Sequence, residues 1–322
     1  MQLNETTIRS GQDQLPLSVW LAGPEGEARG IVQIAHGMSE HKERYEDFIR
    51  FLCGHGFVVL IHDHRGHGKS VRKKDDLGYF YENGGEALVE DLHQLTLWVK
   101  ERYPDLPFFL FGHSMGSLAV RAYTKKYDRE LDGLMVCGCP SYNPAAKMGR
   151  VLVRAMAKFK GERHRSPKMN HMMFGAFNAP FQPADSEFAW ISLNEENVKA
   201  YDADELCGFI FTLNGFESLL DIMLAVYDPK GWKVERPGLP VWFLSGDQDP
   251  CLTSRERFLE AVGLMKQVGY QNVTYKLYEG LRHEILNEKC KETVYQDVLE
   301  KLEEWIGNIQ RLSTYPIAGN QN

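Results

Sequence analysis

Short runs of apolar residues alternate with longer segments of mixed polarity along most of the chain. The short runs are typical of strands buried on both faces of a sheet, and the longer segments have the spacing of helices with one apolar face. Strands are expected at residues 15–21, 31–35, 58–62, 108–111, 133–137, 241–244 and 273–278. Helices are expected at residues 44–53, 86–103, 116–127, 254–268 and 293–310. The alternation predicts an α/β protein with right-handed crossovers and a mostly parallel sheet.

The alternation stops between residues 141 and 233, where methionine, phenylalanine, proline and basic residues replace it. A basic stretch runs from Lys147 to Lys168, and an apolar stretch runs from Met172 to Phe181. Because the alternation then resumes, we expect an insertion between two halves of one sheet. The expected organisation is a first core part at residues 1–140, an insertion at 141–233, a second core part at 234–312 and a frayed polar tail at 313–322.

Composition and charge exclude several classes of protein. The 322 residues are 43% hydrophobic and 25% charged, as in an ordinary globular protein, and the net charge of −7 gives no electrostatic basis for binding nucleic acid. No apolar run approaches the roughly 20 residues of a membrane-spanning helix, and the first residues do not resemble a secretory signal. The six cysteines are scattered through a chain large enough to fold without disulfides, so we expect reduced thiols and a cytoplasmic protein.

A Gly-x-Ser-x-Gly sequence, from Gly112 to Gly116, lies between an expected strand and an expected helix. In this context the central residue occupies a sharp turn that lifts its side chain above the edge of the sheet, and the glycines avoid steric clashes. Ser114 is therefore the candidate nucleophile. The alternative is a chance glycine-rich turn, which the flanking strand and helix disfavour.

A serine nucleophile needs a general base, which a carboxylate orients, and in this type of fold the order along the chain is serine, acid, histidine. His283 is the only histidine after His171 and follows the last expected strand, so it is the candidate base. The loop after the preceding strand carries Asp247 and Asp249, and the residues alone leave the choice between them open. Asp247 also has the ordinary interpretation of a turn residue that caps its own backbone.

The tetrahedral intermediate of acyl transfer needs two backbone N–H donors, one after the nucleophile and one in the loop that follows an early strand. Met115 supplies the first donor. In the early loop Gly37 permits an unusual turn, so Met38 can present the second. His36 lies in the same loop, where it is better explained as a residue that holds the loop by hydrogen bonds than as an acid or base.

Four stretches of the chain resemble the monoacylglycerol lipase and lysophospholipase group of α/β-hydrolases, which are hydrolases of the serine aminopeptidase type. The stretches are His36-Gly-Met-Ser-Glu-His-Lys-Glu-Arg-Tyr45, His62-Asp-His-Arg-Gly-His-Gly-Lys-Ser70, Gly112-His-Ser-Met-Gly116 and Tyr278-Glu-Gly-Leu-Arg-His283. The resemblance covers the core and, more loosely, the insertion. It implies an α/β-hydrolase fold with a mostly parallel eight-stranded sheet, and a helical cap at residues 141–233 that covers the nucleophile and shapes an acyl-chain pocket.

The same resemblance implies roles for individual residues. The acid of the family follows a Gly-x-x-Asp pattern, which falls on Gly246 and Asp249, and the two oxyanion donors fall on Met38 and Met115. One departure is Ser117, where the family often has a second glycine after the nucleophile turn. Serine is small, so we expect only an adjustment of packing there.

These observations predict a serine hydrolase that cleaves carboxylic esters through an acyl-enzyme, with a monoacylglycerol or a lysophospholipid as substrate and with no cofactor or metal. A short-chain carboxylesterase, a thioesterase and a peptidase remain alternatives on the same fold. A non-catalytic ligand-binding protein is disfavoured because all three members of a triad are present. Haloalkane dehalogenases and epoxide hydrolases are excluded because they need an aspartate in place of Ser114.

Two further motifs and two surface features have competing interpretations. The histidine spacing from His62 to His67 imitates a metallo-hydrolase, but Gly66 stands where such sites have an aspartate. Gly68-Lys-Ser70 imitates a phosphate-binding loop, but Asp63 stands at its first glycine position.

The basic stretch is either a solvated helix face or a surface that meets a membrane or an anionic headgroup. The apolar residues of the insertion are either its own core or the lining of a lipid pocket. The oligomeric state stays open.

Overall fold

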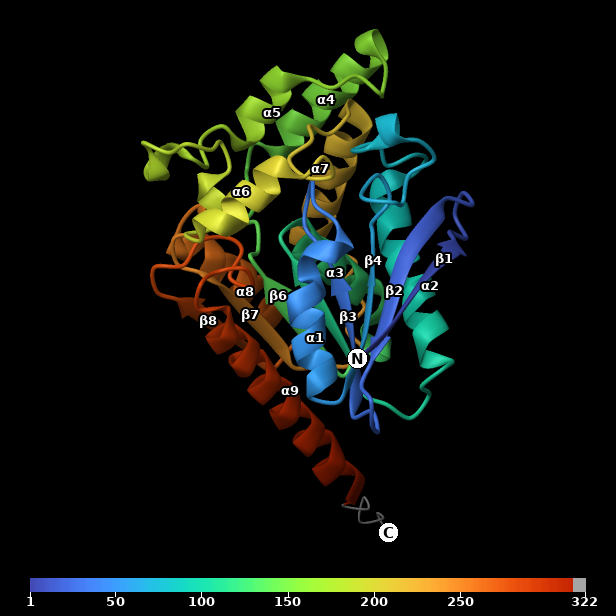
Figure 1. Cartoon of the computed structure of the whole chain (residues 1–322). Coiled ribbons are helices and arrows are strands. Elements are labelled where there is room, and N and C mark those ends of the chain that lie inside the picture. The colour runs from blue at the N-terminus through green and yellow to red at the C-terminus, as the bar shows by residue number, and fades with distance from the viewer. Residues whose placement is uncertain (315–322) are drawn as a thin grey trace.

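The computed structural model describes residues 1–314, and an eight-stranded sheet runs through the centre of this part of the chain (Figure 1). The strand order is β1-β2-β4-β3-β5-β6-β7-β8, in which β2 is antiparallel to both of its neighbours and the remaining pairs are parallel. The strands are β1 (Gln2–Arg9), β2 (Pro16–Gly23), β3 (Gly30–Ala35), β4 (Phe57–His62), β5 (Phe108–His113), β6 (Gly133–Cys137), β7 (Val241–Gly246) and β8 (Val273–Tyr278). The predicted α/β class and mostly parallel sheet are confirmed.

Five helices of the core cover the two faces of the sheet, as the alternating pattern predicts. They are α1 (Glu46–Gly54), α2 (Gly84–Lys100), α3 (Met115–Tyr127), α8 (Arg255–Val268) and α9 (Lys291–Thr314). Phe48 of α1 and Trp305 of α9 pack with Phe109 on one face, whereas α2, α3 and α8 pack with Leu110 on the other. Successive strand residues thus point into different cores, which explains why these strands are apolar at nearly every position.

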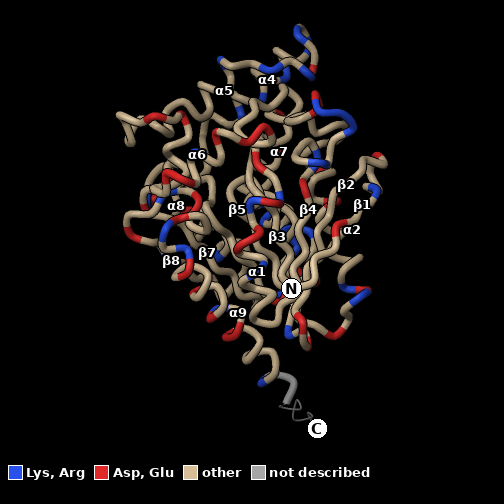
Figure 2. The backbone as a smooth tube through the Cα atoms, in the orientation of Figure 1, with Lys and Arg blue, Asp and Glu red and all other residues tan. Residues whose placement is uncertain are grey.

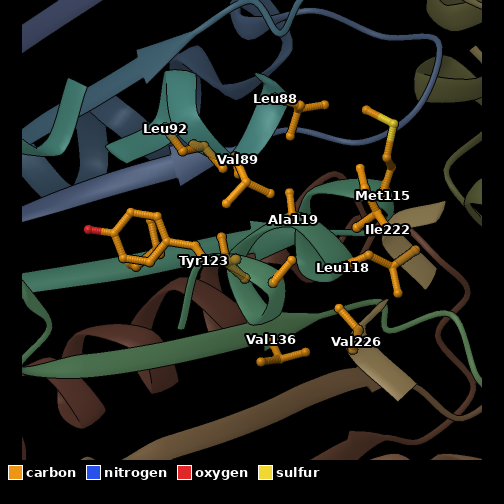
Figure 3. Close-up of a cluster of buried hydrophobic side chains, with 14 of the residues drawn as sticks. Leu88, Val89, Leu92, Met115, Leu118, Ala119, Tyr123, Val136, Ile222 and Val226 are labelled. Carbon is orange, nitrogen blue, oxygen red and sulfur yellow. The ribbon is translucent and has the colours of Figure 1, made fainter. Parts of the chain in front are cut away.

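Figure 3 shows the second of these cores where α2 and α3 meet. Leu88 and Leu92 from α2 face Ala119 and Tyr123 from α3, and Val136 of β6 closes the cluster from below. This packing fixes the start of α3 against the sheet. The candidate serine immediately precedes that helix, so its position is set by a large and fully buried core.

Residues 141–233 leave β6 and return to β7, and they contribute no strand to the sheet. Four helices of this insertion lie above the sheet in Figure 1: α4 (Ala146–Lys160), α5 (Pro167–Phe174), α6 (Glu195–Ala203) and α7 (Leu213–Tyr227). Ile222 and Val226 of α7 join the core of α2 and α3. The base of the insertion is therefore continuous with the core around the sheet, whereas α4 packs on α7 further out.

Within residues 1–314 no helix combines the length and the apolar character needed to cross a membrane. Helix α9 continues to Thr314, two residues into the segment expected to be a polar tail. The rest of that expected tail, residues 315–322, lies outside the described residues.

Candidate active site

Ser114 stands on a sharp turn between β5 and α3, with φ 54° and ψ −119°. Residues other than glycine rarely adopt such backbone angles, and the backbone around this turn is closely packed. A Cβ atom at Gly112 would lie 2.4 Å from the carbonyl oxygen of Gly116, and one at Gly116 would lie 2.0 Å from the carbonyl oxygen of Ala35. Between residues 108 and 124 only Ser114 is not buried. The turn therefore presents this one hydroxyl at the surface of the core.

Ser117 occupies the position at which the chain departs from the family pattern. Its hydroxyl donates to the carbonyl oxygen of Ser114 at 2.6 Å. The same carbonyl also accepts the backbone N–H of Ser117 at 2.9 Å, so the hydroxyl adds a second bond from Ser117 to the strained turn, and the serine is accommodated there.

Asp249 and His283 meet at the carboxyl edge of the sheet, after β7 and β8. Nδ1 of His283 lies 2.9 Å from Oδ2 of Asp249. The same carboxylate accepts the hydroxyl of Ser245 at 2.9 Å and the backbone N–H of Cys251 at 2.8 Å. Burial alone would raise the pKa of Asp249, but the His283 contact and these donors lower it below its usual value. The aspartate is thus held ionised beside the imidazole.

Asp247, the other aspartate that the sequence left open, shares no hydrogen bond with His283, and both are described residues. Its Oδ1 accepts the backbone N–H of Gly280 at 2.8 Å, in the loop after β8. It therefore fastens the loop after β7 to the loop after β8, whereas its sequence position suggested a cap on its own backbone. Of the two carboxylates, the structure places Asp249 at the histidine.

The imidazole of His283 is packed closely on the side of β5 and β6. A Cβ atom at Gly138 would lie 3.1 Å from both His113 Cδ2 and His283 Cε1. Nε2 of His113 lies 3.2 Å from the carbonyl oxygen of His283, and Nε2 of His283 lies 4.0 Å from Sγ of Cys251. Ser114 and His283, both described residues, share no hydrogen bond in this arrangement. Bonds of that kind are often long or absent in a free enzyme and tighten when substrate binds.

The loop after β3 lies against the serine from the other side. A Cβ atom at Gly37 would lie 3.2 Å from Cβ of Ser114, and the Gly37 N–H donates to Oε1 of Glu40 at 2.5 Å. Among the described residues, the backbone N–H groups of Met38 and Met115 have no acceptor. Two unused backbone donors thus lie in the loop after β3 and in the turn after β5, and an oxyanion needs donors of this kind.

Comparison with known proteins identifies the family of the chain. Residues 26–290 match the family model described as serine aminopeptidase, S33. The chain belongs to this family. It is 30% identical over 291 residues to a monoacylglycerol lipase of Mycolicibacterium smegmatis, which covers 89% of this chain and 92% of that protein. It is 29% identical over 299 residues to the human monoglyceride lipase, with 90% and 86% covered.

The fold of this S33-family chain is also similar to that of a solved esterase. The structure of a thermostable carboxyl esterase from Bacillus coagulans superimposes with a TM-score of 0.88, at 28% identity, over 95% of this chain and 99% of that one. The expectation of an α/β-hydrolase fold related to monoacylglycerol lipases is therefore confirmed.

A buried ionic network joins the loop after β3 and the loop after β8 of this α/β-hydrolase. Arg44 binds Oε2 of Glu40 at 2.8 Å and both carboxylate oxygens of Glu284 at 2.7 Å. Oε1 of Glu40 also accepts the hydroxyl of Tyr45 at 2.9 Å and lies 3.5 Å from Nδ1 of His113. Arg44 therefore bridges the loop of Met38 and the loop of His283.

The charges of this network are mutually stabilised. Burial alone would raise the pKa of Glu40, but His113 and Arg44 hold it well below its usual range. Burial would lower the pKa of His113, yet the contact with Glu40 outweighs this effect and raises it. The pKa of Glu284 is likewise lowered, against burial, by Arg44. The sequence contains only a weak signal for this network. Glu40 and Arg44 lie in the stretch from His36 to Tyr45 that resembles the family, and Glu284 directly follows the candidate base.

The second half of the insertion is fastened to the same two loops. Tyr201 of α6 donates its hydroxyl to the carbonyl oxygen of Ser39 at 2.9 Å, and Asn197 donates to Oε2 of Glu284 at 2.7 Å. His41 lies 2.8 Å from Asp204. The insertion is thus joined to the candidate site by polar bonds as well as by the apolar packing of α7.

The histidines that imitated a metal motif form part of a buried packing cluster. Nδ1 of His36 donates to the carbonyl oxygen of Gly37 at 2.8 Å, and Nε2 of His36 accepts the backbone N–H of His64 at 2.9 Å. The ring of His64 lies 4.2 Å from that of His36 and 4.8 Å from that of His62, measured between centroids. His36 therefore holds the loop after β3 by hydrogen bonds, as expected from the sequence.

Proposed function

We propose that this α/β-hydrolase is a serine carboxylic-ester hydrolase that cleaves monoacylglycerols or lysophospholipids. The observation that carries the proposal is the buried Asp249–His283 pair beside a strained turn that exposes Ser114. The similarity to monoacylglycerol lipases along almost their whole length supports the choice of ester class. The proposed acid is Asp249, the base is His283 and the nucleophile is Ser114.

In the proposed mechanism the Ser114 oxygen attacks the ester carbonyl carbon while Nε2 of His283 takes the serine proton. Asp249 fixes the imidazole tautomer through Nδ1 and stabilises the imidazolium that forms. The negative oxygen of the tetrahedral intermediate accepts the N–H groups of Met38 and Met115, each of which is worth about 3 kcal/mol of barrier in comparable enzymes. The carbon–oxygen bond to the alcohol then breaks, and His283 protonates the leaving alkoxide.

The acyl-enzyme is released by water. His283 removes a proton from the water, whose oxygen attacks the acyl carbon, and the collapse of the second tetrahedral intermediate returns the proton to Ser114. The products are a fatty acid and glycerol or a glycerophosphate ester. Every proton moves through His283, so the residues of this chain complete the cycle.

We propose that residues 141–233 act as a cap over this site and supply the acyl-chain pocket. Three half-buried aromatic residues of the insertion touch one another in a series, with ring centroids 5.6 Å apart for Phe174 and Phe177 and 5.2 Å apart for Phe177 and Trp190. Adaptable apolar side chains of this kind suit a flexible hydrocarbon chain.

We propose that the cap also meets a membrane or lipid aggregate through helix α4. Four of its apolar residues are solvent-exposed at helical spacing, and Phe159 is 90% and Met148 72% exposed. This apolar face of α4 consists of Met148, Val151, Leu152 and Phe159. Such a stripe is unusual on a solvated helix and typical of one that lies in a lipid interface.

The basic residues near this face divide into two groups. Arg150 and Arg154 form ion pairs with Asp221 and Glu217 of α7, so they hold the insertion together. Within the described part of the chain, the exposed lysines of the stretch have no carboxylate partner and remain available to anionic lipid. These are Lys147, Lys158, Lys160 and Lys168, and Figure 2 shows the basic residues gathered at α4.

Vesicle binding tests the membrane contact. Co-sedimentation with vesicles of phosphatidylcholine and phosphatidylglycerol should fall strongly for Phe159→Glu combined with Met148→Glu. The control, Leu259→Glu, changes an exposed leucine of α8 and should bind as the unmodified protein does. Equal binding by all three proteins would contradict the contact.

The substrate panel tests the reaction itself. Hydrolysis of p-nitrophenyl esters from acetate to palmitate, monooleoylglycerol, lysophosphatidylcholine and an amino-acid anilide should be measured beside Ser114→Ala, which should lower kcat by about 10⁶. Serine-dependent turnover that favours long acyl chains supports the lipase. Turnover confined to acetate or to the anilide would instead indicate a short-chain esterase or a peptidase.

The proposed cellular location is the cytoplasm. The six cysteines, all of which lie within the described residues, form no disulfide, and Cys290 alone among them is exposed. Free thiols are usual where the surroundings are reducing.

A further inference from the structure

The imidazole of His283 contacts two aromatic rings. The centroid of the Trp190 indole lies 5.0 Å from that of His283, with 43° between the ring planes. The centroid of His113 lies 4.6 Å away at 45°. Trp190 comes from the insertion and His113 from β5, so the candidate base contacts both the insertion and the sheet.

Trp190 is held in this position by the loop that carries His283. It lies in a short helical turn, Ala189–Ile191, whose two ends are both bonded to that loop. The N–H of Glu284 donates to the carbonyl oxygen of Ile191 at 2.7 Å, and the guanidinium of Arg282 donates to that of Ala189 at 2.6 Å. The residues on either side of the histidine therefore fix the tryptophan, and the indole contact is not a chance meeting of mobile side chains.

An indole ring next to a histidine favours the charged form of that histidine. The face of the indole carries negative electrostatic potential, and a cation within about 6 Å of the ring centroid is attracted to it. His283 is neutral when the proposed reaction starts and becomes an imidazolium as Ser114 is deprotonated. An interaction present only with the imidazolium lowers the barrier instead of merely strengthening substrate binding.

Other groups around His283 also favour or oppose its imidazolium form. Asp249 at Nδ1 also favours the imidazolium. Glu40 raises the pKa of His113, and a proton on the His113 ring, 4.6 Å from that of His283, opposes the imidazolium. The Cys251 thiol at Nε2 is kept protonated, because burial raises its pKa. Trp190 is the contact from the insertion that favours the imidazolium, as Asp249 does from the core.

We propose that Trp190 is a positioning residue that stabilises the imidazolium form of His283, so that the inserted segment takes part in the acid–base step. The inference rests on the proposed role of His283 as general base. It assigns to Trp190 a function beyond filling the acyl pocket, and it predicts an effect even on substrates too short to reach that pocket.

The experiment compares Trp190→Leu, which removes the aromatic face but keeps apolar bulk, with Trp190→Phe, which keeps a weaker face. On p-nitrophenyl acetate, Trp190→Leu should lower kcat roughly tenfold with little change in KM, and Trp190→Phe should lose less. The midpoint of the acidic limb of kcat/KM should move to lower pH by roughly half to one unit in Trp190→Leu, because a less stable imidazolium loses its proton earlier.

Trp232→Leu is the matched control, since it makes the same substitution at another half-buried tryptophan of the insertion, whose ring packs against Tyr270 at 6.2 Å between centroids. Its acidic midpoint should equal that of the unmodified protein. Thermal unfolding of each variant shows whether the fold is kept. An unchanged midpoint in Trp190→Leu, or an equal shift in Trp232→Leu, would overturn the proposal.

A second measurement separates this inference from the proposed reaction. The titration of the His283 Cε1 proton can be followed by NMR in Ser114→Ala, with the signal assigned from His283→Gln. A downward shift of its midpoint on adding Trp190→Leu supports the stabilised imidazolium without any turnover, and no shift overturns it. Absence of serine-dependent turnover in the unmodified protein overturns the proposed function, which the NMR titration does not measure.

Discussion

Oδ2 of Asp249 lies 2.9 Å from Nδ1 of His283, in a pocket where that carboxylate also accepts the Ser245 hydroxyl and a backbone N–H. We expect Asp249→Asn to lower kcat by about 10⁴, because an amide at this position favours the wrong imidazole tautomer. Asp247→Asn should cost far less, since Asp247 binds only the backbone of Gly280. Steady-state kinetics of both variants decide the matter, with circular dichroism as the check on folding. Comparable losses in two folded variants would contradict the assignment of the acid.

Replacing Gly37 by alanine tests the proposed oxyanion loop. A Cβ atom at Gly37 would lie 2.6 Å from Oε1 of Glu40 and 3.2 Å from Cβ of Ser114, so the loop must shift. We expect a loss of about 10²–10³ in kcat, the usual effect of removing one oxyanion donor. Gly26→Ala is the control, since its Cβ atom would meet nothing within 4 Å. Unimpaired kcat in Gly37→Ala would exclude this loop from oxyanion binding.

Arg44 should be among the most sensitive positions for stability. Removing its charge in Arg44→Met leaves Glu40 and Glu284 buried without their cation, which should lower the free energy of unfolding by about 3–5 kcal/mol. Urea denaturation measures the change. The exposed pair of Arg50 and Glu46 provides the comparison, and Arg50→Met should change stability by less than about 1 kcal/mol. A loss as small as this in Arg44→Met would show that the network is not stabilised as described.

The buried histidine cluster predicts how stability depends on pH. Burial lowers the pKa of His62 to about 3 and that of His67 to about 4, and it lowers the pKa of His36 and His64 well below the usual value. The unfolded chain therefore binds more protons below pH 6.5, and stability should fall as the pH drops from 6.5 toward 4. Each histidine adds about 1.4 kcal/mol per pH unit to this slope.

Urea denaturation at pH 7, 6 and 5 measures the slope. His62→Leu should lower this slope by the share of one histidine, about 1.4 kcal/mol per pH unit. It should lower the free energy of unfolding little at pH 7, because both ring nitrogens of His62 lack a hydrogen-bond partner. His55→Gln, at an exposed histidine, should leave the slope as it is. A slope unaffected by His62→Leu would contradict the neutral state of the cluster.

The sequence pattern predicted the strands that are buried on both faces and missed β1. Seven strands were expected from the pattern, and each has a counterpart in the sheet. Strand β1 has only two apolar residues, Leu3 and Ile8, and its side chains are almost all exposed, so it presents no apolar run. Its pairing with β2, from Gln2 opposite Gly23 to Arg9 opposite Pro16, comes from the backbone, which leaves little mark on composition.

The candidate site shows a similar division. Ser114 and His283 could be found because the turn and the order along the chain restrict the choice, whereas the choice between Asp247 and Asp249 needed the family resemblance. Contacts between residues far apart in the chain leave no recognisable pattern in the sequence. Arg44 and Glu284 are 240 residues apart in sequence, and Trp190 lies in an insertion without regular rhythm. Only the folded chain shows that these residues meet.

The strained backbone of Ser114 has a consequence for the history of such a chain. A non-glycine residue held at these angles costs on the order of 1–3 kcal/mol, which glycine at the same position would largely avoid. Substitution by glycine would thus remove the proposed nucleophile and relieve the backbone strain in one step. A lineage that no longer needed hydrolysis would be expected to lose this serine early, so its retention in a descendant is a sensitive sign that the reaction is still under selection.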